Sequence, residues 1–258
     1  MVRLTLRVLA MAAGLIACLP LHYLWGLFRR PSPWPRRFLG WVARAAGMRV
    51  RVVGAPLERD VLFLANHLSW LDILVLAGAS GTAFVSKAEV AQVPVVGWLA
   101  GLNNTVFIAR SERAGVRGQA DSLRRALASG QPVALFPEGT TDGGRDVLPF
   151  RASLLASLFP PLPGVRVQPV ALDYGAAAND LAWVGNESGL ANVRKVLSRS
   201  GTVSVTLYFL APVDPSTGER KALARAAREE IVEALGDREK AATLKDPLGP
   251  SGGGADRL

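Results

Sequence analysis

The stretch VLFLANHLSWLD, residues 61–72, contains a strand signal followed directly by a helix signal. Its first five residues are apolar without interruption, which is typical of a buried strand. Asn66 and His67 end this run. Ser69 and Asp72 then form a Ser-x-x-Asp pattern in front of further apolar residues, which predicts the start of a helix. A strand that leads straight into a helix indicates an α/β fold.

The chain continues this alternation beyond residue 48. Short segments rich in β-branched or aromatic residues predict strands at residues 49–53, 61–65, 82–86, 105–109, 132–136, 165–173 and 202–210. Helices are predicted at residues 69–79, 95–102, 112–129, 152–159 and 219–235. We therefore expect an α/β fold with a mixed sheet flanked by helices. The folded domain is expected over residues 49–244, with a flexible Gly- and Pro-containing tail over residues 245–258.

A membrane anchor with a basic juxtamembrane segment is predicted over residues 1–48. Residues 8–28 carry no charge, and a helix of that length spans roughly 30 Å, the thickness of a hydrocarbon core. The segment that follows has no acidic residue but contains a cluster of arginines: Arg29, Arg30, Arg36, Arg37, Arg44, Arg49 and Arg51. The positive-inside rule then places the main domain on the cytoplasmic face of the membrane.

The form of this anchor has alternatives. Pro20 and His22 weaken a straight span, and the apolar residues 38–48 could return the chain as a half-embedded helical hairpin. Residues 15–18, which end in Cys18, match a lipoprotein cleavage pattern. An ordinary signal peptide needs small residues after the apolar run, and Arg29 and Arg30 stand there instead. We expect membrane association, with a span and a hairpin both open.

Composition excludes several classes of protein. Of 258 residues, 50% are hydrophobic and 20% charged, which excludes global disorder. A single cysteine and two histidines exclude a disulfide framework, a Cys-rich zinc site and a multi-histidine metal site, so no metal is expected. The net charge of +9 fits either nucleic acid or an anionic membrane surface. The arginine cluster next to the apolar segment favours the membrane, and no nucleic-acid-binding motif is present.

His67 and Asp72 are the candidates for acid–base chemistry. Histidine is the usual general base near neutral pH, and it needs an acceptor at its other ring nitrogen. Five positions apart on one helix, the two side chains diverge by about 140°. They can meet only if His67 lies in the loop and Asp72 in the first helical turn, with Ser69 as N-cap. In the alternative interpretation, Asp72 only caps the helix.

Two further elements could bind a polar group. Residues 136–144, Phe-Pro-Glu-Gly-Thr-Thr-Asp-Gly-Gly, follow a predicted strand, and Gly-rich turns at strand ends expose backbone N–H groups. Arg110 ends another predicted strand, where its guanidinium could hold a phosphate. Taken singly, an ordinary turn and a solvated arginine explain these features as well.

Taken together, the motifs resemble a known family. Their order is Asn-His-x4-Asp at residues 66–72, Phe-Ile-Ala-Arg at 107–110, Phe-Pro-Glu-Gly-Thr at 136–140 and Gln-Pro-Val at 168–170. This order, and the intervening Ser-Lys-Ala-Glu at 86–89, resembles the glycerolipid acyltransferases typified by 1-acyl-sn-glycerol-3-phosphate acyltransferase. The resemblance covers roughly residues 62–173.

The resemblance implies a mechanism and a set of site residues. His67 removes the proton from the acceptor hydroxyl, and Asp72 orients His67. The oxygen then attacks the thioester of acyl-CoA or acyl carrier protein directly, without a metal or redox cofactor. The residues implied to hold the acceptor's head group are Lys87, Arg110, Glu138, Gly139 and Thr140. The partners are therefore membrane lipids, a lysolipid acceptor and the acyl donor.

Two departures bear on the acceptor. Thr141 stands where the family usually has an arginine, and the form Phe-Pro-Glu-Gly-Thr-Thr-x-Gly-Gly resembles a subgroup proposed to acylate lyso-ornithine lipid. Lysophosphatidic acid is the acceptor that we favour on the sequence, with lyso-ornithine lipid as the alternative. A catalytically silent, membrane-anchored binding protein is the alternative of another class. A serine hydrolase is disfavoured because no Gly-x-Ser-x-Gly elbow is present.

Overall fold

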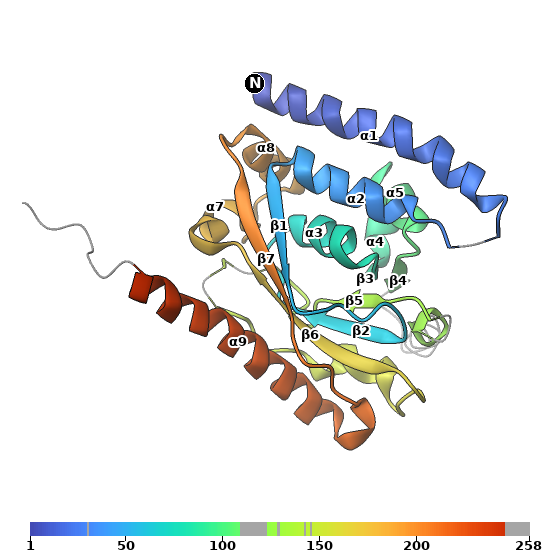
Figure 1. Cartoon of the computed structure of the whole chain (residues 1–258), viewed down its shortest axis with the longest axis vertical. Helices are drawn as coiled ribbons and strands as arrows, with labels where there is room; N and C mark the ends of the chain where they lie inside the picture. The colour runs from blue at the N-terminus through green and yellow to red at the C-terminus, as the bar shows by residue number, and fades with distance from the viewer. Residues whose placement is uncertain (30, 109–122, 128–129, 142, 145, 246–258) are drawn as a thin grey trace, which may run out of the picture.

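The computed structural model describes residues 1–29, 31–108, 123–127, 130–141, 143–144 and 146–245 (Figure 1). Within them a seven-stranded sheet has the order β1-β7-β6-β2-β5-β3-β4. The strands are β1 (Met48–Val53), β2 (Val61–Ala65), β3 (Ala83–Lys87), β4 (Val106–Ile108), β5 (Val133–Leu135), β6 (Arg166–Asp173) and β7 (Val203–Phe209). All neighbours are parallel except β6 and β7, so the expected mixed sheet is confirmed.

The seven predicted strands are present, with ends within one residue of those expected. The sequence pattern of the central strands is strong, because a strand in the middle of a parallel sheet is covered on both faces and therefore consists of a nearly continuous run of apolar residues. In β2 all five residues are buried. The parallel register between β2, β5 and β6 brings the carboxyl ends of these strands to one edge of the sheet.

The helices agree less closely with expectation. The predicted helices α3 (Leu71–Ser80) and α5 (Val96–Leu102) are present, and α9 (Arg220–Lys245) runs ten residues further than predicted. The segment predicted at 152–159 is a 3₁₀ helix, η1 (Ala152–Leu158), as is common for short pieces. Most of the helix predicted at residues 112–129 lies outside the described residues. The prediction missed the short helices α4 (Ala88–Ala91) and α7 (Ala178–Leu181), and also α8 (Gly189–Ser198), which Ser188 caps.

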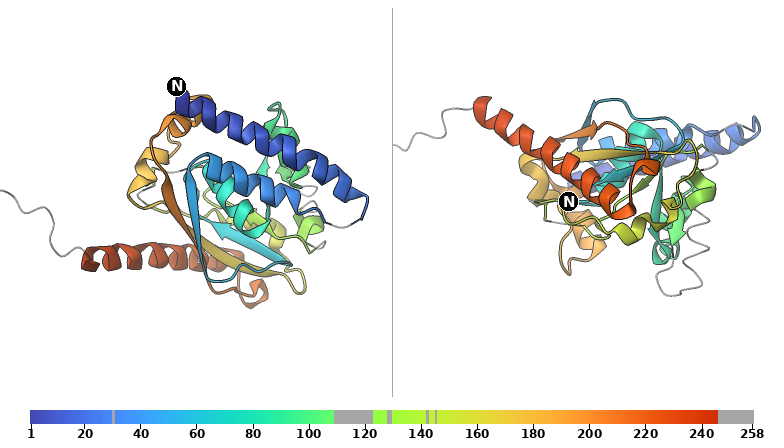
Figure 2. Two further views of the ribbon diagram at one scale, coloured as in Figure 1. Left: turned by 45° about the horizontal axis from the view of Figure 1, so that its top comes forward. Right: turned by 90° about the horizontal axis from the view of Figure 1, so that it is seen from below.

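The first two helices form an antiparallel pair on one side of the molecule. These are α1 (Val2–Gly26) and α2 (Trp34–Ala45), which run side by side (Figures 1 and 2). The Trp41 Nε1–H donates to the carbonyl of Ala10 at 2.7 Å. The Arg7 guanidinium donates to the carbonyls of Val196 at 3.1 Å and Gly201 at 2.9 Å. Among the described residues, α1 is the one helix long and apolar enough to cross a membrane.

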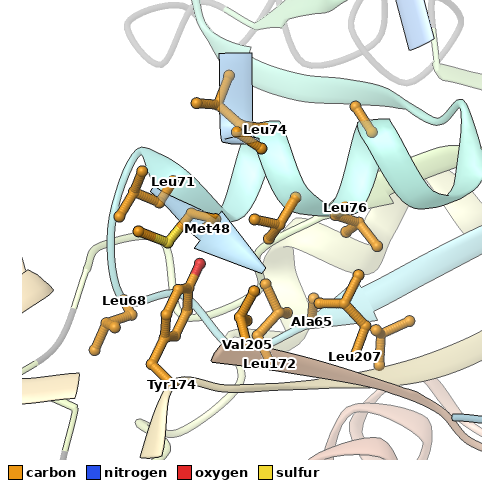
Figure 3. Packing of buried hydrophobic residues seen from close by; sticks show 14 of the residues in the cluster. Met48, Ala65, Leu68, Leu71, Leu74, Leu76, Leu172, Tyr174, Val205 and Leu207 are labelled. Carbon is orange, nitrogen blue, oxygen red and sulfur yellow. The ribbon is translucent and has the colours of Figure 1, made fainter. Parts of the chain in front are cut away.

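Hydrophobic side chains fill both faces of the sheet. On one face, residues of α2, α3 and α8 pack against β2, β6 and β7 (Figure 3). On the other face, α9 and η1 cover β2, β5 and β6, and α9 lies opposite α1 and α2 (Figures 1 and 2). Val42, Ala43 and Ala46, at the end of α2, belong to the first of these cores. The same core fixes the start of α3 beside the carboxyl ends of β2 and β6.

Candidate active site

The candidate site lies where β2, β5 and β6 end. Residues 66–70 connect β2 to α3, residues 136–144 follow β5, and Tyr174 follows β6. Asn66 ties two of these segments together: its Nδ2 donates to the carbonyl of Leu172 at 3.1 Å, and its Oδ1 accepts the Leu172 N–H at 2.7 Å. Segments that are far apart in the sequence therefore meet at one edge of the sheet, where α/β folds bind their ligands.

His67 and Asp72 are in contact. The His67 Nδ1 lies 2.8 Å from the Asp72 Oδ2, with His67 in the loop and Asp72 in the first turn of α3. The same carboxylate oxygen accepts the backbone N–H groups of Leu68 at 2.7 Å and Ser69 at 2.8 Å. One oxygen thus contacts the imidazole and also accepts two N–H groups of the loop in front of α3, so Asp72 does more than bond to the backbone.

The expected N-cap was wrong in one respect. The N-cap residue of α3 is Trp70, and the Ser69 hydroxyl makes no hydrogen bond. Asp72 reaches back into the loop because its side chain is fully buried and three donors converge on one oxygen. Donation by several groups stabilises the charged carboxylate where water is excluded.

Tyr174 is a site residue that the sequence analysis missed. Its hydroxyl donates to the second oxygen of Asp72, Oδ1, at 2.7 Å. Burial, and then the negative charge of Asp72, raise the pKa of Tyr174 well above its ordinary value, so the phenol keeps its proton and remains a donor. The sequence did offer a signal for it: Tyr174 directly follows β6, whose carboxyl end lies at the same edge of the sheet as that of β2.

Two residues of the Phe-Pro-Glu-Gly-Thr motif hold His67 from other directions. The imidazole stacks on the Phe136 ring with centroids 4.1 Å apart and planes 13° apart. The Glu138 Oε1 accepts the backbone N–H of His67 at 2.8 Å, and its Oε2 accepts that of Leu148 at 3.2 Å. The first and third motifs of the sequence are therefore joined around one imidazole.

The other predicted binding residues are less closely grouped. Gly139 adopts a φ of 72°, and Thr140, next to it, is exposed. Lys87 is exposed at the end of β3. Arg110 lies outside the described residues. Thr141 occupies the position at which the resembled family usually has an arginine. Its hydroxyl donates to the carbonyl of Trp183.

A cavity of about 450 Å³ opens beside His67. Its wall includes Asn66, Glu138, Asp146, Asp173 and Tyr174. Among the residues of this wall that the structure describes there is no lysine or arginine. The arrangement places an imidazole, held by a carboxylate, beside a pocket with acidic side chains in its wall, and such an arrangement suits proton removal from the hydroxyl of a positively charged molecule.

Known proteins share this architecture. Residues 49–173 match the acyltransferase family. The chain is 33% identical over 250 residues to a lyso-ornithine lipid O-acyltransferase of Brucella abortus, an alignment that covers 89% of this chain and 92% of the relative. The chain belongs to the acyltransferase family. The family resemblance that the motif order predicts is therefore confirmed.

Two further comparisons describe the family members around this chain. It is 38% identical over 125 residues to a 1-acyl-sn-glycerol-3-phosphate acyltransferase of Neisseria gonorrhoeae, covering 47% of this chain and 48% of the relative. The crystal structure of the 1-acyl-sn-glycerophosphate (LPA) acyltransferase PlsC from Thermotoga maritima has a TM-score of 0.60 at 24% identity, covering 92% of this chain and 98% of that one. This acyltransferase therefore shares the PlsC fold.

Proposed function

We propose that this acyltransferase moves a fatty acyl group from an acyl thioester to the hydroxyl of lyso-ornithine lipid. The observation that carries the proposal is the acidic cavity beside the His67–Asp72 pair. Relatives that align along nearly the whole chain and bear this name support the same acceptor. The alternative acceptor of the sequence analysis thereby becomes the first candidate.

The charge of the cavity distinguishes the two acceptors. The lyso-ornithine head carries an ammonium and a carboxylate, whereas lysophosphatidic acid carries a phosphate. The exposed carboxylate of Asp146 in the wall attracts an ammonium and repels a phosphate, because like charges a few ångströms apart destabilise one another. Thr141 adds no compensating cation.

The mechanism follows from the contacts of His67. With the Nδ1 proton directed at Asp72, the Nε2 lone pair accepts the proton of the acceptor hydroxyl. The oxygen forms a bond to the thioester carbonyl carbon, and the tetrahedral intermediate collapses by breaking the carbon–sulfur bond. The thiolate leaves with the proton from His67. No cofactor takes part, and acyl-CoA or acyl carrier protein brings the acyl group as co-substrate.

Asp72 and Tyr174 serve this reaction as positioning residues. The imidazole becomes positively charged in the transition state, and the Asp72 carboxylate stabilises that charge. Tyr174 fixes the second oxygen of the carboxylate, so that the first one stays aimed at Nδ1. Lys87, Arg110, Gly139 and Thr140 remain the proposed contacts to the rest of the acceptor.

The second candidate acceptor is lysophosphatidic acid. The 38% identity to the Neisseria gonorrhoeae enzyme over 125 residues favours it. Lys87 and Arg110 are the cations that would hold its phosphate. On this alternative the head group would avoid the acidic wall of the cavity.

We place the protein at the cytoplasmic face of a membrane, with residues 1–48 as anchor and 49–244 as the acyltransferase domain. Arg7 ties the start of α1 to the domain, and α1 runs back along α2. A helix held in this way along its length favours a half-embedded hairpin over a span that leaves the domain. The arginines that follow α1 attract anionic lipid head groups.

The test is acyl transfer by detergent-solubilised protein with one labelled acyl thioester. Lyso-ornithine lipid and lysophosphatidic acid are supplied in parallel, each with the His67→Ala variant as control. We expect label in ornithine lipid that is lost in the variant. Label only in phosphatidic acid would replace the proposed acceptor by the second candidate, and label in neither would favour a silent binding protein.

A further inference from the structure

A short apolar turn projects from the domain at α4 and α5. Residues 91–96 are all exposed, and none is charged. The exposed fractions are 46% for Val93, 60% for Val95, 51% for Val96 and 43% for Trp98. Four large apolar side chains within six residues form a patch, and a patch of this kind on a protein surface marks an interaction site more often than scattered single residues do.

The backbone holds these side chains outward. Val95 has a φ of 65° and a ψ of −53°, and the Val96 N–H donates to the carbonyl of Pro94 at 2.7 Å. This is the γ-turn with positive φ, which is rare and strained, above all for a β-branched residue. A strained backbone persists only where its surroundings determine it, and such sites are concentrated at functional surfaces.

Gly97 provides that determining contact. It is buried against the end of α4, where an added Cβ would lie 2.3 Å from the carbonyl oxygen of Ala91. Its N–H donates to the carbonyl of Val93 at 2.8 Å. The turn is thus closed tightly on itself.

The turn lies on the side of the molecule that carries α1. In Figure 1 and in the left view of Figure 2, α4 and α5 lie on the same side of the sheet as α2 and α1, whereas α9 lies on the opposite side. The end of α1 also exposes large apolar side chains, with exposed fractions of 56% for Leu24, 76% for Leu27 and 65% for Phe28. Both elements therefore present apolar groups from one side of the fold.

We propose that the turn between α4 and α5 is a second membrane contact, inserted into the same lipid surface as α1. This inference rests on the proposed membrane location of the protein. The absence of charge from residues 90–98 suits an apolar acyl region. Trp98 suits the boundary, because tryptophan is enriched where lipid meets water.

Two contacts fix an orientation that one helix alone leaves free. A single amphipathic element lets the domain rotate about its axis, whereas a second contact on another element removes that rotation. The domain then keeps one edge of the sheet at a constant position relative to the lipid from which its acceptor comes.

The test uses a polarity-sensitive fluorophore on single cysteines. Cys18 is the protein's own cysteine and reports on α1. In a Cys18→Ser background, Val96→Cys places the label on α5, outside the strained Val95. Val232→Cys is the matched control, since Val232 is an exposed valine on α9 with an exposed fraction of 42%.

Vesicles of phosphatidylcholine and phosphatidylglycerol are then added to each full-length labelled protein. We expect blue-shifted emission for the labels at 18 and 96 and unchanged emission at 232. A shift at 18 without a shift at 96 would overturn the second contact and leave the anchor intact. Unchanged emission at both 18 and 96 would overturn the membrane location and with it this inference.

A pair of charge substitutions provides a readout without labels. Val96→Asp places a charge in the acyl region and should weaken co-sedimentation with the same vesicles by about 10-fold, since burying an isolated charge in lipid is strongly unfavourable. Val232→Asp should leave co-sedimentation unchanged. Equal binding of the two variants would contradict the second contact.

Discussion

The imidazole of His67 is held from three directions. Asp72 accepts at Nδ1, Phe136 stacks on the ring, and Glu138 accepts the backbone N–H. An imidazole so fixed needs little rearrangement before it removes a proton, which is how positioning lowers a barrier. The spacing of His67 and Asp72 allowed their pairing, but it left helix capping by Asp72 as an alternative. The contact of Tyr174 was missed, because 102 residues separate it from Asp72 and only the order of the strands in the sheet brings them together.

Tyr174→Phe tests the positioning role at this scale. Removing the hydroxyl leaves one oxygen of a buried carboxylate without its donor, and a hydrogen bond to a charged group contributes about 1.5–3 kcal/mol. We expect kcat to fall by roughly 10-fold while the KM for the acceptor stays unchanged. Steady-state kinetics measure kcat and the KM for the acceptor separately. An increase in KM with unchanged kcat would mean that Tyr174 contacts the substrate instead.

The same variant has a pH signature. The raised pKa of Tyr174 means that, above about pH 10, the unfolded chain loses this proton while the folded protein keeps it. The stability that depends on this proton is present below that pH and is lost as pH rises towards the folded pKa. The wild-type Tm should therefore fall more steeply above about pH 10 than that of Tyr174→Phe. If the Tm of the wild type and the Tm of Tyr174→Phe fell equally steeply with pH, the result would argue against a protonated, buried phenol.

Asp146→Asn tests the charge of the cavity. Asp146 is exposed in the wall, so the effect is modest, since exposed charge pairs contribute about 0.2–1 kcal/mol. The KM for lyso-ornithine lipid should rise by roughly 3-fold, and that for lysophosphatidic acid should not rise. Asp180→Asn, an exposed carboxylate outside the cavity wall, is the control. A rise for both lipids would show that charge does not select the acceptor.

Close contact between α2 and α3 is the feature that matters at the scale of elements. Gly40 and Gly78 face one another, and a Cβ on Gly78 would lie 2.6 Å from the Gly40 Cα. The start of α3 carries Asp72, so this contact also supports the site. Gly78→Ala should lower the Tm despite the higher helix propensity of alanine, because the backbone of α2 has to move.

Gly236→Ala is the matched control for that substitution. Gly236 also lies in a helix, α9, and an added Cβ meets nothing within 4 Å. Here alanine should stabilise the protein by roughly 0.5–1 kcal/mol, the usual difference in helix propensity. Thermal melts of the two variants should therefore shift in opposite directions. Equal shifts would mean that α2 and α3 tolerate separation.

The helices and strands differ in how well the sequence predicts them. The central strands β2 and β6 were predictable because burial on both faces favours a nearly continuous apolar run. The helix α8 was missed because half its face is polar and a single serine begins it. Because its residues are apolar, the C-terminal end of α2 was assigned to the membrane anchor. Val42 and Ala43 in this part of α2 also pack in the core of the domain.

At the scale of the whole molecule, the apolar helix and the catalytic edge belong to one folded unit. Arg7 bonds to the end of α8, and α2 packs on α3, which carries Asp72. The proposed membrane attachment through α1 would thus keep the site close to the lipid surface. This arrangement suits an enzyme whose acceptor and product both remain in the membrane.

Ile16→Arg tests the attachment as a whole. Ile16 lies in the middle of α1 with an exposed fraction of 74%, so the substitution leaves the core untouched and puts a charge on the surface that we propose to face lipid. The share of protein in the membrane fraction should fall several-fold, since a charge in the bilayer costs about 2.5 kcal/mol or more. Val232→Arg on α9 should partition as the wild type does. Unchanged partition of Ile16→Arg would refute the role of α1.

The central claim is that His67 is the base of a direct transfer with no acyl-enzyme intermediate. The most direct measurement is a single turnover with a thioester labelled in its acyl group, with and without lyso-ornithine lipid, for the wild type and His67→Ala. We predict label in the lipid only when acceptor is present, none bound covalently to the protein, and less than about a tenth of the wild-type rate in the variant. Label bound to the protein in the absence of acceptor would contradict the account. A folded His67→Ala variant that transfers the acyl group at more than about a tenth of the wild-type rate would contradict it as well.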